Sequence, residues 1–213
     1  MEQLFTILLI IHIVAGSIGL FTGTMNIIRK KGDKLHKRVG KYFLYGMLIN
    51  GFAGLIMSLI HTNYFLLIIA VFSIYMVSTG QRYLSLKKLN KGQKPEKIDW
   101  ILTFSMFVFA IIFIGFGIYL MVNGNNFGLV LIVFGIISIL MVKKDISVYK
   151  GNVKEKNYWL LLHLQRMIGA YIAATTAFLV VNNTILPGVV AWLLPTVILT
   201  PLIVKWSRKY KIV

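Results

Sequence analysis

Seven long apolar runs dominate this chain of 213 residues and restrict what it can fold into. Crossing about 30 Å of hydrocarbon takes roughly 20 mostly apolar residues in a helix, which satisfies its own backbone hydrogen bonds. The fifth run is close to the lower limit of length. The first lacks the basic leading segment of a signal peptide, which favours a retained helix. The runs predict an all-α integral membrane bundle of seven transmembrane helices, at residues 3–28, 41–61, 64–84, 99–122, 127–142, 158–181 and 188–206.

The lysines and arginines between these runs predict the orientation of the bundle. Residues 29–41, 84–97, 143–156 and 205–213 contain seven, five, five and four of them. The other three links, "HTN", "NGNN" and "NNTILPG", contain none. Basic residues accumulate on the cytoplasmic side of membrane proteins. We therefore expect the N-terminus outside, the C-terminus in the cytoplasm, and a single integral membrane domain over 1–213 that crosses a bacterial cytoplasmic (inner) membrane seven times.

The same distribution explains the net charge of +17, which comes from 23 Lys and Arg against six Asp and Glu. In a soluble protein this excess would suggest nucleic acid as a partner. Here it serves as a topology signal and attracts anionic lipid headgroups, at about 1 kcal/mol for each residue near the surface. The expected partner is therefore the lipid bilayer. The absence of cysteine excludes disulfides and thiolate metal sites.

Acidic residues are expected only at span ends or in links. This description covers all six of them, Glu2, Asp33, Glu96, Asp99, Asp145 and Glu155. Because no carboxylate is expected in mid-membrane, a proton relay or a cation site built on buried acids is not predicted.

The sixth run carries an unusual polar group near its cytoplasmic end, His163, Gln165 and Arg166. His163 and Arg166 are three residues apart and therefore share one helix face. Arg166 is expected roughly 10 Å deep, at 1.5 Å per residue from the aromatic residues that open the run. Alanines continue the same face, which indicates contact with other helices rather than lipid. The polar group should therefore face the inside of the bundle.

Further polar residues are predicted at the same level. The third run ends with Gln81 and Arg82, and Asp99 opens the fourth run from the same side, where it could neutralise one arginine. Two interpretations follow. The cluster is either a pocket for an anionic or polar molecule, or a structural network of Arg–Asp and His–carbonyl contacts that joins three helices.

His12 is the polar residue expected deepest in the first run. Its face continues through Gly16, Gly19 and Gly23, a stripe that permits close approach of a neighbouring helix. Asn50, near the middle of the second run, is expected to join two helices through its amide. His12 is therefore either a hydrogen-bonded residue at a tight helix contact or a proton-responsive ligand residue.

A haem held by two histidines requires both residues at nearly the same depth. By their positions in the runs, His12 and His61 differ by more than about 10 Å, and so do His12 and His163. Only His36 could meet His163, if the basic link after the first run folds back or its "KLHKRVGKYF" segment begins the second helix. No cofactor is predicted, but one haem b or quinone near the inner face stays open as an alternative.

Several segments together resemble a bacterial family of predicted multi-pass membrane proteins of unknown function. They are "HIVAGSIGL", "KGDKLHKRVGKYF", "FSIYMVSTGQRYL", "KIDW", "HLQRMIGAYIAATTAFLVVN" and "WLLPTVILTPLI". The resemblance spans nearly the whole chain. It implies a single integral membrane domain and assigns no catalytic residue.

We therefore expect a non-enzymatic protein that binds or transports a small polar or anionic molecule at the cytoplasmic leaflet. Arg166 and Arg82 would attract the anion, and His163 and Gln165 would orient it. The alternatives are a membrane redox protein with haem or quinone, and a structural or assembly protein without a ligand.

Overall fold

The computed structural model describes residues 1–212, apart from the side chain of Val189. This part of the chain contains no β-strand, and its seven α-helices are each long and apolar enough to cross a membrane. The predicted all-α fold is confirmed, as is the prediction of seven helices that could span a membrane. The helices are α1 (Glu2–Ile28), α2 (Lys34–Ile60), α3 (Tyr64–Tyr83), α4 (Lys97–Val122), α5 (Phe127–Tyr149), α6 (Tyr158–Asn182) and α7 (Gly188–Tyr210), with a short 3-10 helix η1 (Leu89–Lys91) between α3 and α4.

Two helices extend well beyond the apolar runs that predicted them. Helix α2 begins at Lys34, seven residues before the second run, and α5 continues to Tyr149, seven residues beyond the fifth run. An apolar run marks the length that hydrocarbon covers, whereas backbone hydrogen bonding continues into the polar zone. Asp33 caps α2 by accepting a hydrogen bond from the backbone N–H of His36 at 2.6 Å. His36 is therefore a helix residue, as one of the two predicted possibilities had it.

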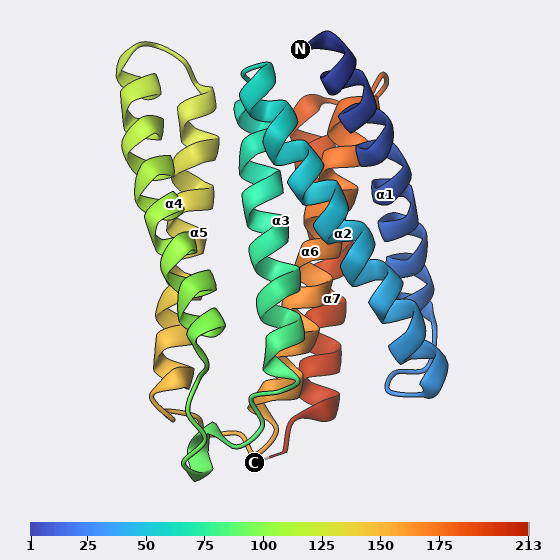
Figure 1. Ribbon diagram of the computed structural model, residues 1–213, viewed down its shortest axis with the longest axis vertical. Helices are drawn as coiled ribbons and strands as arrows, with labels where there is room; N and C mark the ends of the chain where they lie inside the picture. Colours follow the sequence, from blue (N-terminus) through green and yellow to red (C-terminus); the bar gives the residue numbers. More distant parts are fainter. Residues whose placement is uncertain (213) are drawn as a thin grey trace.

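The helices run up and down between two ends of the bundle (Figure 1). The α1–α2 pair lies on one side, the α4–α5 hairpin on the other, and α3 lies between them. Helices α6 and α7 pack together, and α6 also contacts α3 and α1. One end carries the three links 29–33, 84–96 and 150–157 together with the C-terminus. We call it the basic end, since nearly all lysines and arginines lie there.

Helix pairs approach closely where glycines face each other. A methyl group on Gly46 of α2 would lie 3.0 Å from the carbonyl oxygen of Ala15 in α1. A methyl group on Gly117 of α4 would lie 2.7 Å from the carbonyl oxygen of Gly128 in α5. Small residues of this kind let membrane helices pack backbone against backbone. They fix which face of each helix turns inward.

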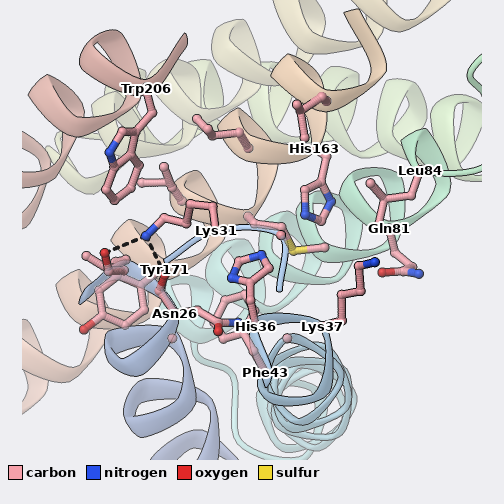
Figure 2. A pocket seen from close by; sticks show the side chains of 18 of the residues that line it. Asn26, Lys31, His36, Lys37, Phe43, Gln81, Leu84, His163, Tyr171 and Trp206 are labelled. Carbon is pink, nitrogen blue, oxygen red and sulfur yellow. Dashed lines mark hydrogen bonds between the residues drawn. The ribbon is translucent and has the colours of Figure 1, made fainter. Parts of the chain in front are cut away.

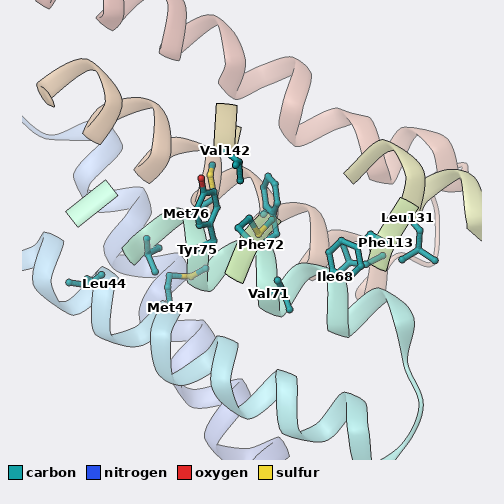
Figure 3. Packing of buried hydrophobic residues seen from close by; sticks show 14 of the residues in the cluster. Leu44, Met47, Ile68, Val71, Phe72, Tyr75, Met76, Phe113, Leu131 and Val142 are labelled. Carbon is teal, nitrogen blue, oxygen red and sulfur yellow. The ribbon is translucent and has the colours of Figure 1, made fainter. Parts of the chain in front are cut away.

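The main apolar core surrounds α3, which contacts α2, α4, α5 and α6. Figure 3 shows its side chains, among them Met47 of α2, Ile68 and Phe72 of α3, and Phe113 of α4. The core fills the middle of the bundle. Polar side chains gather between α3, α5 and α6 toward the basic end.

Candidate functional site

Arg166 and Asp145 form an ion pair inside the bundle. The Arg166 Nη2 atom lies 2.5 Å from Asp145 Oδ1, and the two side chains are 4% and 0% exposed. Asp145 also accepts hydrogen bonds from the hydroxyls of Tyr75 and Tyr83 of α3. The prediction that placed Asp145 in a link is wrong. The residue lies within α5, one turn before its end, and its carboxylate is completely buried.

Asp145 was misplaced because the fifth run loses its apolar character at Lys143 and Lys144, both of which are exposed. Continuing the helical spacing of the apolar residues past these lysines would have placed Asp145 on the buried face. The buried face of α5 includes Ser138, Val142 and Asp145 at spacings of four and three. That spacing is the repeat of one helix face. An acid in register with a buried face needs a buried cation, and Arg166 supplies it.

Arg82 forms the second ion pair, and it is the arginine that Asp99 neutralises. Its Nε lies 2.7 Å from Asp99 Oδ1 and its Nη2 3.0 Å from Oδ2, a bidentate contact. Asp99 also accepts a hydrogen bond from the backbone N–H of Glu96, and Glu96 itself lies 3.1 Å from Arg82. Both arginines of the predicted cluster are thus neutralised by acids of the α4–α5 hairpin or of the link before it.

A separate cavity of about 620 Å³ opens at the basic end between α1, α2, α3, α6 and α7. Figure 2 shows its side chains. No acidic residue of the described chain lines it. Its basic lining residues are Lys31, Lys37, Lys41, Lys87, His36 and His163. We call it the basic cavity.

His163 extends from α6 into the basic cavity (Figure 2). Its Nδ1 atom lies 2.8 Å from the carbonyl oxygen of Gly80 in α3. A carbonyl only accepts, so Nδ1 carries the proton and Nε2 of the neutral ring keeps its lone pair. The cavity therefore has an imidazole with a fixed orientation. Gly80 permits this contact, since a methyl group there would lie 2.9 Å from Cβ of Arg166.

Two buried polar atoms on the wall of the cavity have no hydrogen-bond partner within the described chain. They are Oδ1 of Asn26, at the end of α1, and Nδ1 of His36, in the first turn of α2. An unsatisfied buried polar atom costs about 1–3 kcal/mol, so such atoms are uncommon in native proteins. Both side chains lie beside the cavity in Figure 2, where a ligand could satisfy them.

Lys31 closes the end of α1. Its ammonium donates hydrogen bonds to the carbonyls of Asn26, Ile27 and Arg29 at 2.7, 2.7 and 2.9 Å. It also lies 4.0 Å from the ring centroid of Trp206 in α7, a cation–π contact. Burial lowers the pKa of this ammonium. Lys31 thus joins the α1–α2 turn to α7 and holds one wall of the cavity in place.

The structure separates the predicted site residues into different places. Gln81, His36 and His163 line the basic cavity. Arg82, Arg166 and Asp99 belong to the two ion pairs and lie outside its lining. Gln165 is exposed, with its amide 3.4 Å from the Ser207 hydroxyl.

His12 lies apart from the basic cavity, in contact with α2. Its Nδ1 is 3.0 Å from the carbonyl oxygen of Asn50, and the Asn50 amide donates to the carbonyl of His12 at 2.9 Å. This reciprocal pair is the tight, hydrogen-bonded helix contact that the sequence offered as one interpretation. Asn50 joins two helices as predicted.

Sequence reasoning missed several lining residues, notably Asn26, Lys37 and Trp206. The sequence indicates a role for the lysines in topology and in attracting anionic lipid headgroups, but does not place them in a cavity. Asn26 gave a usable signal, because an amide in the last turns of an apolar run requires a partner. Trp206 gave none, since aromatic residues are common at the ends of membrane spans.

Neither known protein families, nor curated proteins, nor solved structures contain a match to this chain.

Proposed function

We propose that this chain is a multi-pass membrane protein that binds or carries a small anionic molecule in the basic cavity, with the basic end facing the cytoplasm. The observation that carries the proposal is the charge of the lining, which contains four lysines and two histidines and no acid. The orientation rests on the concentration of basic residues in the links of that end.

The ion pairs strengthen this interpretation. Arg82 and Arg166 are neutralised by acids, so the field in the cavity comes from its lysines. A concave site whose charged side chains are all positive, and whose walls are otherwise apolar, concentrates field lines and attracts anions. Ammonium groups also form charge-assisted hydrogen bonds, which are about twice as strong as neutral ones. The anion role that the sequence assigned to the arginines thus passes to Lys37, Lys41 and Lys87, which are all exposed at the cavity.

The test compares two probes of opposite charge, octyl phosphate and octyltrimethylammonium, on protein in phosphatidylcholine nanodiscs. Trp159 and Trp206 line the cavity and report binding through their fluorescence. We expect octyl phosphate to bind and the cation not to. Replacing Lys37, Lys41 and Lys87 by Gln should weaken octyl phosphate binding at least about tenfold, equivalent to about 1.4 kcal/mol.

A matched control removes the same charge from the same end of the bundle. Lys94, Lys97 and Lys150 are exposed and lie outside the cavity lining. Their triple replacement by Gln should change the affinity less than the cavity variant does. If both triple variants lose affinity equally, the probe responds to the general surface charge and the proposal fails. A protein without a ligand, the structural alternative, would bind neither probe.

One observation favours the redox alternative as a second candidate. His36 and His163, the only two histidines that the sequence allowed to meet, both line the basic cavity. A histidine that donates from Nδ1 to a carbonyl, as His163 does, leaves Nε2 available as an iron ligand. Protein purified with added haem b should then show a Soret band that is lost in both His36→Ala and His163→Ala. A wild-type protein without that band would eliminate the haem candidate.

A further inference from the structure

The basic cavity has two chemically different walls. The α1–α2 side presents Asn26, His36 and Lys37. The α6 side presents His163 near the basic end together with four apolar residues, Leu160, Leu164, Met167 and Ile168. The last three share one helix face beyond His163 and form an apolar stripe along α6. A ligand that contacts both walls must be polar at one end and apolar along its length.

Two aromatic rings line the cavity farther from the basic end. Phe43 of α2 and Tyr171 of α6 lie with ring centroids 6.5 Å apart. Both contact the position of Gly23 in α1, where a side chain would displace them. Phe43 follows His36 by seven residues and Tyr171 follows His163 by eight, which corresponds to about 10–12 Å along each helix. His36, Lys37 and His163 therefore lie nearer the basic end than the two rings do, and Asn26 lies between, three residues after Gly23.

We infer that the occupant is an anionic amphiphile, with a phosphate-type headgroup at Asn26, His36 and Lys37 and an aliphatic chain along the α6 stripe toward Phe43 and Tyr171. This inference rests on the proposed function, because it names the ligand class of the same cavity.

The headgroup assignment follows from the unpartnered atoms. Oδ1 of Asn26 needs a donor, and Nδ1 of His36 needs either a donor or an acceptor. The ammonium of Lys37 supplies positive charge, whereas that of Lys31 is occupied by three carbonyls. In its monoanionic form, a phosphate monoester offers a P–OH donor, acceptor oxygens and negative charge in one group. A simple carboxylate offers no donor.

The chain assignment follows from size and polarity. A volume of about 620 Å³ falls in the range of about 300–1,000 Å³ that is typical of sites for drug-sized ligands. Inorganic phosphate would reach the polar wall and leave the stripe at Leu164, Met167 and Ile168 without apolar contact. An aliphatic chain that covers the stripe removes its own surface and that of the stripe from water. Each buried methylene of the ligand should therefore raise its affinity up to about fourfold.

The experiment measures binding as a function of chain length. Inorganic phosphate, butyl phosphate and octyl phosphate are titrated into protein in phosphatidylcholine nanodiscs, with empty nanodiscs correcting for partition of the probe. We expect affinity to rise in that order, by at least about a hundredfold from butyl to octyl phosphate. Binding of inorganic phosphate as tight as that of octyl phosphate would overturn the inference and leave the proposed function standing. If no probe binds in a lysine-dependent way, both fail.

A variant pair places the chain within the cavity. Met167→Gln makes the stripe polar, and Met121→Gln makes the same change on α4, where Met121 is exposed and lies outside the cavity. The first should abolish most of the gain from butyl to octyl phosphate, and the second should preserve it. Equal chain-length dependence in both variants would place the chain elsewhere and refute the inference.

The last arm distinguishes the source of the amphiphile. Octyl phosphate is titrated again in nanodiscs that contain phosphatidylglycerol, an anionic bilayer lipid. Weaker binding than in phosphatidylcholine shows that the bilayer lipid competes for the cavity, which supports a membrane lipid as occupant. Unchanged binding supports a single-chain amphiphile taken from the cytoplasm.

Discussion

Arg166 of α6 and Asp145 of α5 form an ion pair, and both side chains are buried. Arg82 and Asp99 repeat this arrangement between α3 and α4. In both pairs the carboxylate belongs to the α4–α5 hairpin and the guanidinium belongs to the rest of the bundle. The two ion pairs therefore fix how the hairpin docks.

Breaking the buried pair from one side should be strongly destabilising. Asp145→Leu leaves the Arg166 guanidinium buried without a counter-charge and removes the acceptor of two tyrosine hydroxyls. We expect a loss of about 3–5 kcal/mol in the free energy of unfolding, measured by denaturant titration in detergent micelles.

The double variant Asp145→Leu/Arg166→Leu is the control for this prediction. Removing both charges also removes the cost of burying them, so the double variant should be more stable than Asp145→Leu alone. If the loss in the double variant equals the sum of the losses in Asp145→Leu and Arg166→Leu, the two residues are not a coupled pair.

The glycine contact between α4 and α5 gives a second prediction. Gly117→Ala should destabilise the protein by about 1–3 kcal/mol, because the added methyl group meets the rigid backbone carbonyl of Gly128 at 2.7 Å. Gly115→Ala, two residues earlier on the same helix, meets nothing within 4 Å. It should be neutral or stabilise by up to about 1 kcal/mol, since alanine is the better helix residue. The measurement is the thermal unfolding temperature of the two variants, and equal temperatures would contradict the prediction.

The reciprocal pair of His12 and Asn50 should contribute a measurable but smaller amount. Asn50→Leu removes the amide donor and is expected to cost about 0.6–1.7 kcal/mol, the range for hydrogen bonds between membrane helices. Asn182→Leu serves as the comparison, because the Asn182 amide is exposed and bonds only to its own helix. Similar losses in the two variants would argue that the helix contact depends on the glycines alone.

The cap of α2 should respond to pH. The backbone N–H of His36 donates to the Asp33 carboxylate and, with help from Arg29, lowers the pKa of Asp33 below the ordinary value of about 3.9. Because the folded-state pKa is the lower one, the stabilisation is complete above about pH 4 and is lost as the pH falls through the folded value. The backbone amides in the first turn of α2 should therefore lose protection from hydrogen exchange, relative to their intrinsic rate at each pH, as the pH falls through that value.

Asp33→Ser separates capping from titration. A serine hydroxyl also accepts from the helix N-terminus but does not ionise in this range. The variant should keep the protection of the first turn and lose its dependence on acidic pH. An unchanged pH profile would show that another group controls the effect.

Part of the site was readable in the sequence. Asp99 was expected to neutralise one arginine, and it pairs with Arg82, because both lie at helix ends that meet at the basic end of the bundle. Arg166 pairs with Asp145 instead. This acid lies in a helix because α5 extends past its apolar run. His163 and Arg166 were expected to act together. Three residues of helix leave them about 60° apart, enough for one to face the cavity and the other to face α5.

The sequence by itself determined the number of helices and the end at which the basic residues gather. Both depend on local properties, since the length of an apolar run and the charge of a link act without reference to distant residues. Only the tertiary structure decided that Asn26, His36, His163 and Trp206 surround one cavity. That outcome depends on how each helix is rotated about its axis, which is set by close contacts such as Gly46 against Ala15 and Gly80 against Arg166.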